Sequence, residues 1–221
     1  TGACAVHCRY CFRRHYPYQE SSSSSKHWQA SLDHIKDDSS IEEVILSGGD
    51  PLTLSDRRLQ EICASIANIK HIKRIRFHTR LPIVLPARVT TTLLKQITDN
   101  DKSIIFVIHS NHANELDNSV STIIKRLQEF DILVLNQSVL LKNINDSVTA
   151  LINLSERLIE NNVIPYYLHL LDPVAGAAHY DVSLDDAQSL MEEMQARVSG
   201  YLVPKLVKEE VGASSKTLIM N

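Results

Sequence analysis

Three of the four cysteines lie close together near the start of the chain, at Cys4, Cys8 and Cys11, with the spacing C-x3-C-x2-C. The fourth, Cys63, falls in a distant helical pattern typical of a buried residue, so disulfide pairing would leave a clustered thiol unpaired. Thiols in this arrangement indicate an inorganic site. Zinc would need a fourth ligand such as His7 or His15, whereas an iron–sulfur cluster on three thiolates keeps an open iron position. The spacing modestly favours the cluster.

A second set of polar residues directly follows short apolar runs along the chain. The set comprises Gly48-Gly49-Asp50, His78-Thr79-Arg80, His109, Gln137 and Asp172. Each run is rich in β-branched residues or leucine, so each polar residue is expected at the carboxyl end of a strand. In a (β/α) barrel these ends meet at one mouth, where active sites form. The sequence therefore predicts a polar site at the mouth of a barrel.

The elements that must position these residues alternate between strand and helix. Strands are expected at 44–46, 72–78, 104–108, 132–135 and 164–171, and helices at about 28–35, 55–68, 91–98, 120–128 and 147–160. Such alternation predicts an α/β fold with a parallel sheet covered by helices. A barrel should begin with a strand, yet only three residues precede Cys4. We therefore expect a fragment: a partial (β/α)6 TIM-like barrel whose first strand is missing from this chain.

Composition and charge argue against several classes of protein. The chain has 221 residues, of which 43% are hydrophobic and 22% charged, as in an ordinary soluble domain with a substantial core. The net charge is −3 without long blocks of like charge, so neither a nucleic-acid surface nor a membrane surface is predicted. No stretch approaches the roughly 18 apolar residues of a membrane span, and no signal peptide is visible. Clustered free thiols suit a reducing compartment, so a cytoplasmic location is expected.

The cysteine spacing, with Tyr10 before the last cysteine, and the GGDP loop at 48–51 together resemble the radical S-adenosylmethionine (SAM) superfamily. Within it the chain resembles the lysine 2,3-aminomutases, most closely the branch that makes (R)-β-lysine for modification of elongation factor P. The segments that carry the resemblance are CRYCFRR (8–14), LSGGDPL (46–52), TRLPIVLPARVT (79–90), HSNHANEL (109–116), LNQSVLLKNIND (135–146), PYYLHLLDPVAGAAHY (165–180), SGYLVPKLV (199–207) and SKT (215–217). The resemblance implies a radical SAM core barrel over residues 1–200 and a C-terminal segment, 201–221, that carries a cofactor lysine.

By this resemblance, the clustered cysteines hold a 4Fe–4S cluster, and SAM chelates its fourth iron. The residues expected around SAM are Tyr10 near the adenine, the Gly48-Gly49-Asp50 loop at the methionine amino group, and His109 and Gln137. Reduction by an electron donor such as flavodoxin or ferredoxin would cleave SAM to a 5′-deoxyadenosyl radical. The cofactor supplies that chemistry and the protein positions it.

The same resemblance assigns a second cofactor and a substrate. Lys216 is the expected catalytic residue, because the aldehyde of pyridoxal 5′-phosphate (PLP) needs an amine that the substrate can displace. Arg80 is a candidate for contact with the PLP phosphate. Arg13 matches the family arginine that clamps the substrate carboxylate, and Asp172 and Glu209 match the acids that receive the lysine ε-ammonium. The family often has aspartate at the position of Glu209. Family members also have arginines for the PLP phosphate in a region ahead of the cysteine loop.

The function implied is an isomerase that moves the α-amino group of L-lysine to Cβ. The product would be β-lysine, which a downstream ligase would attach to elongation factor P. One alternative is a catabolic aminomutase for free lysine or for another amino acid such as glutamate or arginine, although the acids at 172 and 209 disfavour an acidic side chain. A remote alternative is a non-catalytic zinc-binding module. No nucleic-acid or membrane partner is expected, and a homo-oligomer is left open.

Overall fold

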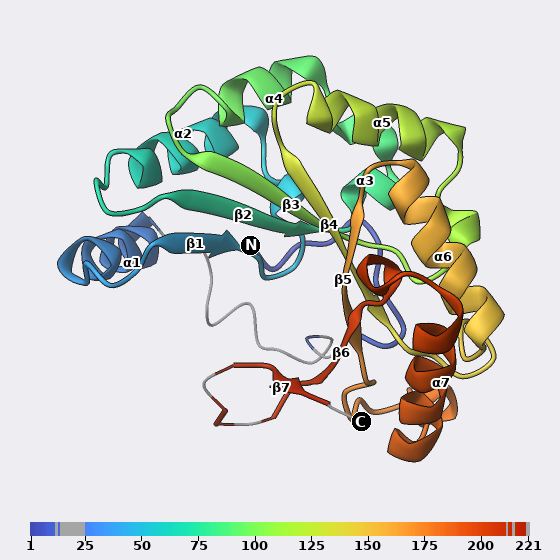
Figure 1. Cartoon of the computed structure of the whole chain (residues 1–221). Helices are drawn as coiled ribbons and strands as arrows, with labels where there is room; N and C mark the ends of the chain where they lie inside the picture. The colour runs from blue at the N-terminus through green and yellow to red at the C-terminus, as the bar shows by residue number, and fades with distance from the viewer. Residues whose placement is uncertain (12, 14–24, 211, 214, 220–221) are drawn as a thin grey trace.

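The computed structural model describes residues 1–11, 13, 25–210, 212–213 and 215–219. In this part of the chain a sheet in the order β1 to β7 curls into a half-barrel (Figure 1). Its strands are β1 (Glu43–Leu46), β2 (Arg74–Thr79), β3 (Ser103–His109), β4 (Leu133–Val139), β5 (Ile164–His169), β6 (Lys205–Lys208) and β7 (Thr217–Leu218). Neighbours from β1 to β6 pair in parallel, and β7 pairs antiparallel with β6. The expected partial α/β barrel is confirmed.

The longer helices lie along the outside of the curved sheet (Figure 1). The helices are α1 (Ser25–Asp37), α2 (Asp56–Ala67), α3 (Leu81–Val84), α4 (Thr91–Ile97), α5 (Asn118–Gln128), α6 (Val148–Glu160) and α7 (Leu184–Arg197). Short 3-10 turns are η1 (Pro51–Thr53), η2 (Pro86–Arg88), η3 (Ala113–Glu115), η4 (Ala178–Tyr180) and η5 (Gly200–Leu202). Five helices start where a side-chain oxygen accepts a backbone N–H, at Ser55, Thr90, Asp117, Ser147 and Ser183.

The alternation of side chains along the strands divides the core from the cavity. On β2, Ile75 and Phe77 are fully buried in the apolar layer under the helices, where the ring of Phe77 stacks on that of Phe106 at 5.0 Å. Arg76 and His78 point to the opposite, concave side and line a cavity. Successive residues of a strand face opposite sides of the sheet, so each strand contributes side chains both to the apolar core and to the cavity. Cys63 is fully buried in the apolar layer, as predicted.

The start of the chain lies against the edge of β1. The N–H of Gly49 donates to the carbonyl of Thr1 at 2.6 Å, and the N–H of Asp50 donates to that of Ala3 at 2.7 Å. A Cβ on Gly49 would lie 2.1 Å from the oxygen of Ala3, which explains the need for glycine. These bonds attach the residues that precede Cys4 to the mouth of the half-barrel.

Apart from the 3-10 turns, four of the described elements were not predicted: α3, α7, β6 and β7. Strand β6 has only four residues, too few for a periodic pattern, although Leu206 and Val207 are buried. Helix α7 carries a visible signal: Ser183 caps it, and Ala187, Met191 and Met194 recur at helical spacing and are buried. The predicted division of the chain at residue 200 stays a prediction. None of the described helices is long and apolar enough to cross a membrane.

Candidate active site

A cavity of about 650 Å³ opens at the carboxyl ends of the strands. All of the predicted site residues line it: Cys4, Cys8, Tyr10, Cys11, Arg13, Gly48, Gly49, Asp50, Arg80, His109, Gln137, Asp172, Glu209 and Lys216. They come from segments that are up to about two hundred residues apart in sequence, and the parallel sheet brings them together because its strand ends share one edge. The roles assigned to them stay predictions, but the shared location does not depend on those roles.

Asp50 holds the loops at the mouth together. Its carboxylate is 6% exposed and accepts hydrogen bonds from the hydroxyl of Thr79 and the N–H of Arg80, both at 2.7 Å. It also accepts the N–H of Leu52 at 3.0 Å. The carboxylate is therefore engaged by protein donors.

The cysteines are free thiols on one wall of the cavity, and each is partly exposed. Burial raises the pKa of the Cys4 thiol, and the negative charges of Asp50 and of the other two cysteines raise it further, against the effect of Arg13. Among the described residues, no three His, Cys, Asp or Glu side chains are grouped to hold a metal ion. His15, a possible zinc ligand, lies outside those residues. A zinc ion needs its ligands around one point, whereas a cluster takes one thiolate at each of three irons. The arrangement fits the cluster better.

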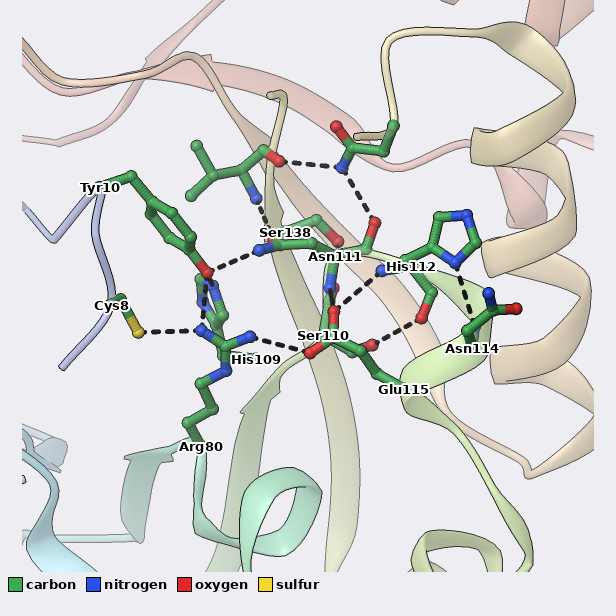
Figure 2. A network of polar contacts seen from close by, with 12 residues as sticks. Cys8, Tyr10, Arg80, His109, Ser110, Asn111, His112, Asn114, Glu115 and Ser138 are labelled. Carbon is green, nitrogen blue, oxygen red and sulfur yellow. Dashed lines mark hydrogen bonds and ion pairs between the residues drawn. The ribbon is translucent and has the colours of Figure 1, made fainter. Parts of the chain in front are cut away.

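A polar network holds the cysteine loop against β3 (Figure 2). The Tyr10 hydroxyl accepts from Arg80 Nη1 at 2.8 Å and from Asn111 Nδ2 at 2.6 Å, and it lies 2.8 Å from His109 Nε2. Arg80 Nη1 also donates to Cys8 Sγ at 2.9 Å. Burial lowers the pKa of His109 to about 3, and nearby Arg80 adds to this, so the imidazole is neutral at pH 7.

Glu115 completes this network and was not predicted as a site residue. Its carboxylate accepts from Arg80 Nη2 at 2.8 Å and from the N–H groups of Asn111 at 2.7 Å and His112 at 3.1 Å. It therefore fixes the Arg80 guanidinium beside Cys8. The signal was present in the HSNHANEL segment, where Glu115 forms a capping box with His112 at the start of η3.

Arg13 joins the cysteine loop to the glycine loop. Its Nη1 donates to the hydroxyl of Ser47 and to the carbonyl of Gly48, both at 2.8 Å. The guanidinium thus enters the cavity between the two loops that were expected to surround SAM. This position is compatible with contact to a carboxylate in the cavity.

The inner faces of β2 and β5 also line the cavity, and of their residues only His78 was singled out from the sequence, without a role assigned to it. Arg76, His78 and His169 line it together with Tyr166 and Tyr167. Burial lowers the pKa values of His78 and His169 to about 4, so both imidazoles are neutral at pH 7. The two consecutive tyrosines face one cavity because the register with β4 shifts at this point, as in a β-bulge.

Lys216 and two acids gather at the far end of the cavity. The Lys216 ammonium donates to the Glu209 carboxylate and lies 5.8 Å from the centre of the Tyr167 ring. Burial and the negative charge of Glu209 raise the pKa of Asp172, while Lys216 lowers it. Asp172, Glu209 and Lys216 are therefore near enough to influence one another.

Sequence comparison with known proteins finds a family model and several relatives that match this chain. A family model described as a 4Fe-4S single cluster domain matches residues 1–98. The L-lysine 2,3-aminomutase of Escherichia coli K12 is 47% identical over 98% of this chain, and that of Haemophilus influenzae is 46% identical over 98%. These alignments cover 63% and 64% of the two relatives, so the chain spans somewhat less than two thirds of their length.

Solved structures show the same fold at low identity. The structure of Streptococcus suis SuiB bound to S-adenosylmethionine aligns with a TM-score of 0.68 at 17% identity and covers 96% of this chain and 49% of that one. A radical SAM methyltransferase from Sphaerobacter thermophilus aligns with a TM-score of 0.55 at 13% identity, covering 83% and 56%. The half-barrel therefore has the fold of these radical SAM structures. In sequence, the chain is similar to these two L-lysine 2,3-aminomutases over nearly its whole length.

Proposed function

We propose that this chain forms the catalytic core of a radical SAM, PLP-dependent isomerase that converts L-lysine into β-lysine. The observation that carries the proposal is that the cysteine loop and Lys216 line the same cavity, although they stand at opposite ends of the chain. A metal cluster and a lysine-bound aldehyde could therefore serve one substrate. The homology to L-lysine 2,3-aminomutases supports this reading.

The cluster end of the cavity would hold the iron and SAM. Cys4, Cys8 and Cys11 supply three soft thiolate ligands, which suits a 4Fe–4S cluster. Bound there, the cluster and SAM would supply a carbon radical. The chain's own part is to fix this wall: Arg80 places a positive charge 2.9 Å from Cys8 Sγ, and Tyr10 is held by Arg80 and Asn111. We assign Tyr10, His109, Gln137 and the glycine loop to the SAM pocket.

The opposite end would hold PLP and the substrate cation. Lys216 is the only described lysine on the cavity wall, so it is the amine available to an aldehyde. Once the lysine is linked to PLP, Glu209 and Asp172 become available to an incoming ammonium group. A buried cation needs paired countercharge, and two acids provide it. Arg13 would bind the substrate carboxylate, which sets the orientation of the amino acid between two opposite charges.

We also propose a physiological role for the product of the reaction. We place the product, (R)-β-lysine, in modification of elongation factor P by a downstream ligase in the cytoplasm, with flavodoxin or ferredoxin as electron donor. A catabolic aminomutase for free lysine remains the alternative, and the enantiomer of the product separates the two. We also retain the division into a core barrel, 1–200, and a cofactor-lysine segment, 201–221.

The experiment begins with anaerobic reconstitution of the chain with iron and sulfide. We expect brown protein with about four irons per chain. Cys11→Ala should lose most of the iron, whereas Cys63→Ala, which removes a buried thiol far from the cavity, should keep it. Colourless protein with one zinc and no iron would contradict the proposal.

Turnover is then measured with lysine, SAM, PLP and a reductant. The expected product is β-lysine, identified by chiral chromatography. An (R) product supports the elongation factor P role, and an (S) product supports the catabolic one. Unchanged lysine from protein that carries both cofactors would remove the isomerase assignment.

A further inference from the structure

We infer that Arg80 and Glu115 set the reduction potential of the 4Fe–4S cluster proposed for the cysteine loop. Arg80 donates a hydrogen bond to a sulfur that would bind iron, and Glu115 is the positioning residue that holds Arg80 there. The inference rests on the proposed function only for the cluster, since it needs neither PLP nor lysine. The two residues would control how readily the cluster accepts an electron.

The first observation is a charged hydrogen bond to one of the three clustered thiols. Arg80 Nη1 donates to Cys8 Sγ at 2.9 Å, and the same nitrogen donates to the Tyr10 hydroxyl at 2.8 Å (Figure 2). The guanidinium stays positively charged at physiological pH. Hydrogen bonds to the ligand sulfurs are among the factors that set the potential of an iron–sulfur cluster. Arg80 is therefore placed to influence that potential.

Glu115 fixes the guanidinium in this position. Its Oε2 accepts from Arg80 Nη2 at 2.8 Å, and its Oε1 accepts the backbone N–H groups of Asn111 at 2.7 Å and His112 at 3.1 Å. The carboxylate is therefore attached to the backbone that follows β3 while it binds Arg80. An unrestrained arginine side chain has about 2 kcal/mol of rotamer entropy, so a fixed partner is needed to keep it on one sulfur.

The backbone of Arg80 is fixed as well. Its N–H donates to Asp50 Oδ2 at 2.7 Å, and the Asp50 carboxylate is buried. The side chains of Arg80 and Glu115 are only 22% and 24% exposed. Charges that are shielded from water interact more strongly than charges on the surface, because the effective dielectric constant is lower. The positive charge therefore acts on Cys8 with less screening than a surface arginine would.

The geometry gives the effect a sign. Reduction adds one electron, and hence one negative charge, to the cluster and its thiolates. Arg80 Nη1 contacts Cys8, whereas the Glu115 carboxylate contacts Nη2, so the guanidinium lies between the sulfur and the carboxylate (Figure 2). Because Coulomb energy falls with distance, the positive charge dominates at the sulfur. Arg80 therefore favours the reduced cluster and raises its potential.

This role accounts for the contacts of Arg80 better than the PLP phosphate contact suggested by the sequence. Both Nη atoms are bonded beside the cysteine loop, Nη1 to Cys8 and Nη2 to Glu115. Lys216, to which PLP would be linked, pairs with Glu209 at the other end of the cavity. We therefore assign Arg80 to the cluster.

The test is a redox titration of the reconstituted chain, without SAM, PLP or lysine, in which electron paramagnetic resonance measures the reduced cluster. Arg80→Gln removes the positive charge beside Cys8. At the midpoint potential of the unmodified chain, we expect its ratio of reduced to oxidised cluster to be at least tenfold lower, a shift of about 59 mV for one electron. Arg126→Gln, an arginine of α5 bonded to the Val89 carbonyl outside the cavity, is the matched control and should keep the midpoint.

Glu115→Ala separates positioning from simple charge. Loss of a negative charge alone would raise the potential, whereas release of the Arg80 guanidinium from Cys8 lowers it. We expect the potential to fall. In the Arg80→Gln background, where no guanidinium is left to position, the same substitution should raise the potential or leave it unchanged. This double-mutant cycle measures how far Glu115 acts through Arg80.

The outcomes keep the inference apart from the proposed function. Equal midpoints for the unmodified chain and Arg80→Gln, or a rise in Glu115→Ala, would overturn the inference and leave the cluster in place. A chain that takes up no iron–sulfur cluster would overturn the proposed function and the inference with it. If a variant alone binds no iron, Arg80→Lys or Glu115→Gln replaces it with a smaller fall expected, and no fall there counts against the inference.

Discussion

At the residue scale, the cavity wall contains two kinds of polar group. Asp50, Arg80 and Glu115 form several hydrogen bonds to the protein, and these bonds fix the loops that carry the cysteines. Lys216, by contrast, lines the cavity and carries a charge there, with Glu209 as its ion-pair partner. The first group sets the shape of the site and the second is placed to meet a ligand.

Removal of the lysine amine tests the cofactor assignment. Lys216→Ala should abolish the visible absorbance that PLP gains when it is linked to a protein amine, and turnover should fall below detection, because the amine that binds the aldehyde is gone. Lys205→Ala on β6, where the side chain is exposed, should change neither. Absorbance titration with PLP checks both variants. Retained absorbance in Lys216→Ala would move the cofactor to another amine.

The sequence predicted the lining of the cavity well and its internal bonding poorly. Residues at strand ends could be placed at one mouth because the topology of parallel strands requires it. Glu115 could not be assigned, since its importance depends on which side chains meet across loops far apart in sequence. The contact between Arg80 and Cys8, 72 residues apart, is of that kind.

At the element scale, β2 and β5 place histidines where they cannot easily be charged. The pKa values of His78 and His169 fall from 6.5 to about 4, mainly through burial. Below pH 6.5 the unfolded chain binds protons that the folded chain does not, so the free energy of unfolding falls as pH drops from about 6.5 toward about 4. Each histidine contributes a loss of roughly 3 kcal/mol over that window.

Urea denaturation at several pH values measures this effect. The double variant His78→Phe, His169→Phe should show a much flatter dependence on pH than the unmodified chain. The same slope in both would mean that other groups cause the loss of stability at acid pH.

The attachment of the chain start to β1 gives a second prediction at this scale. Gly49→Ala places a methyl group 2.1 Å from the carbonyl oxygen of Ala3, so the hydrogen bonds to Thr1 and Ala3 must break or shift. We expect a loss of about 1–3 kcal/mol in stability and weaker retention of iron after reconstitution. Gly200→Ala, where the added atom meets nothing within 4 Å, is the matched control. Normal iron content in Gly49→Ala would show that the cysteine loop does not need this anchor.

Helices and strands with a clear periodic pattern of hydrophobic residues could be predicted from the sequence, and short ones could not. The strands up to β5 and the helices α1, α2, α4, α5 and α6 were found because each has enough residues to show its buried face, whereas α7 was missed although its signal is present. Strand β6 is defined by its pairing with β5 and not by a pattern of its own. The shift in register beside Tyr166 was equally invisible, since it arises from how two strands meet.

At the scale of the whole molecule, one sheet connects both ends of the chain. Strand β6 is the last of the parallel strands; it buries Leu206 in an apolar cluster with residues of α7, and Val207 is buried as well. Removal of residues 201–221 should therefore lower stability by roughly 4.5–9 kcal/mol through the lost burial of Leu202, Leu206 and Val207. Comparison of urea midpoints for 1–200 and 1–221 tests this. Identical midpoints would make the C-terminal segment energetically independent of the barrel.

The ion pair between Lys216 and Glu209 has a consequence for the sequence in which small molecules are taken up. The ammonium of Lys216 is the same chemical group as the side-chain cation of free lysine, so Glu209 already holds an internal mimic of the proposed substrate. Linkage of that amine to an aldehyde would replace the ammonium group and so free Glu209 from this ion pair. The protein would then have to bind the vitamin-derived cofactor before it can bind the amino acid.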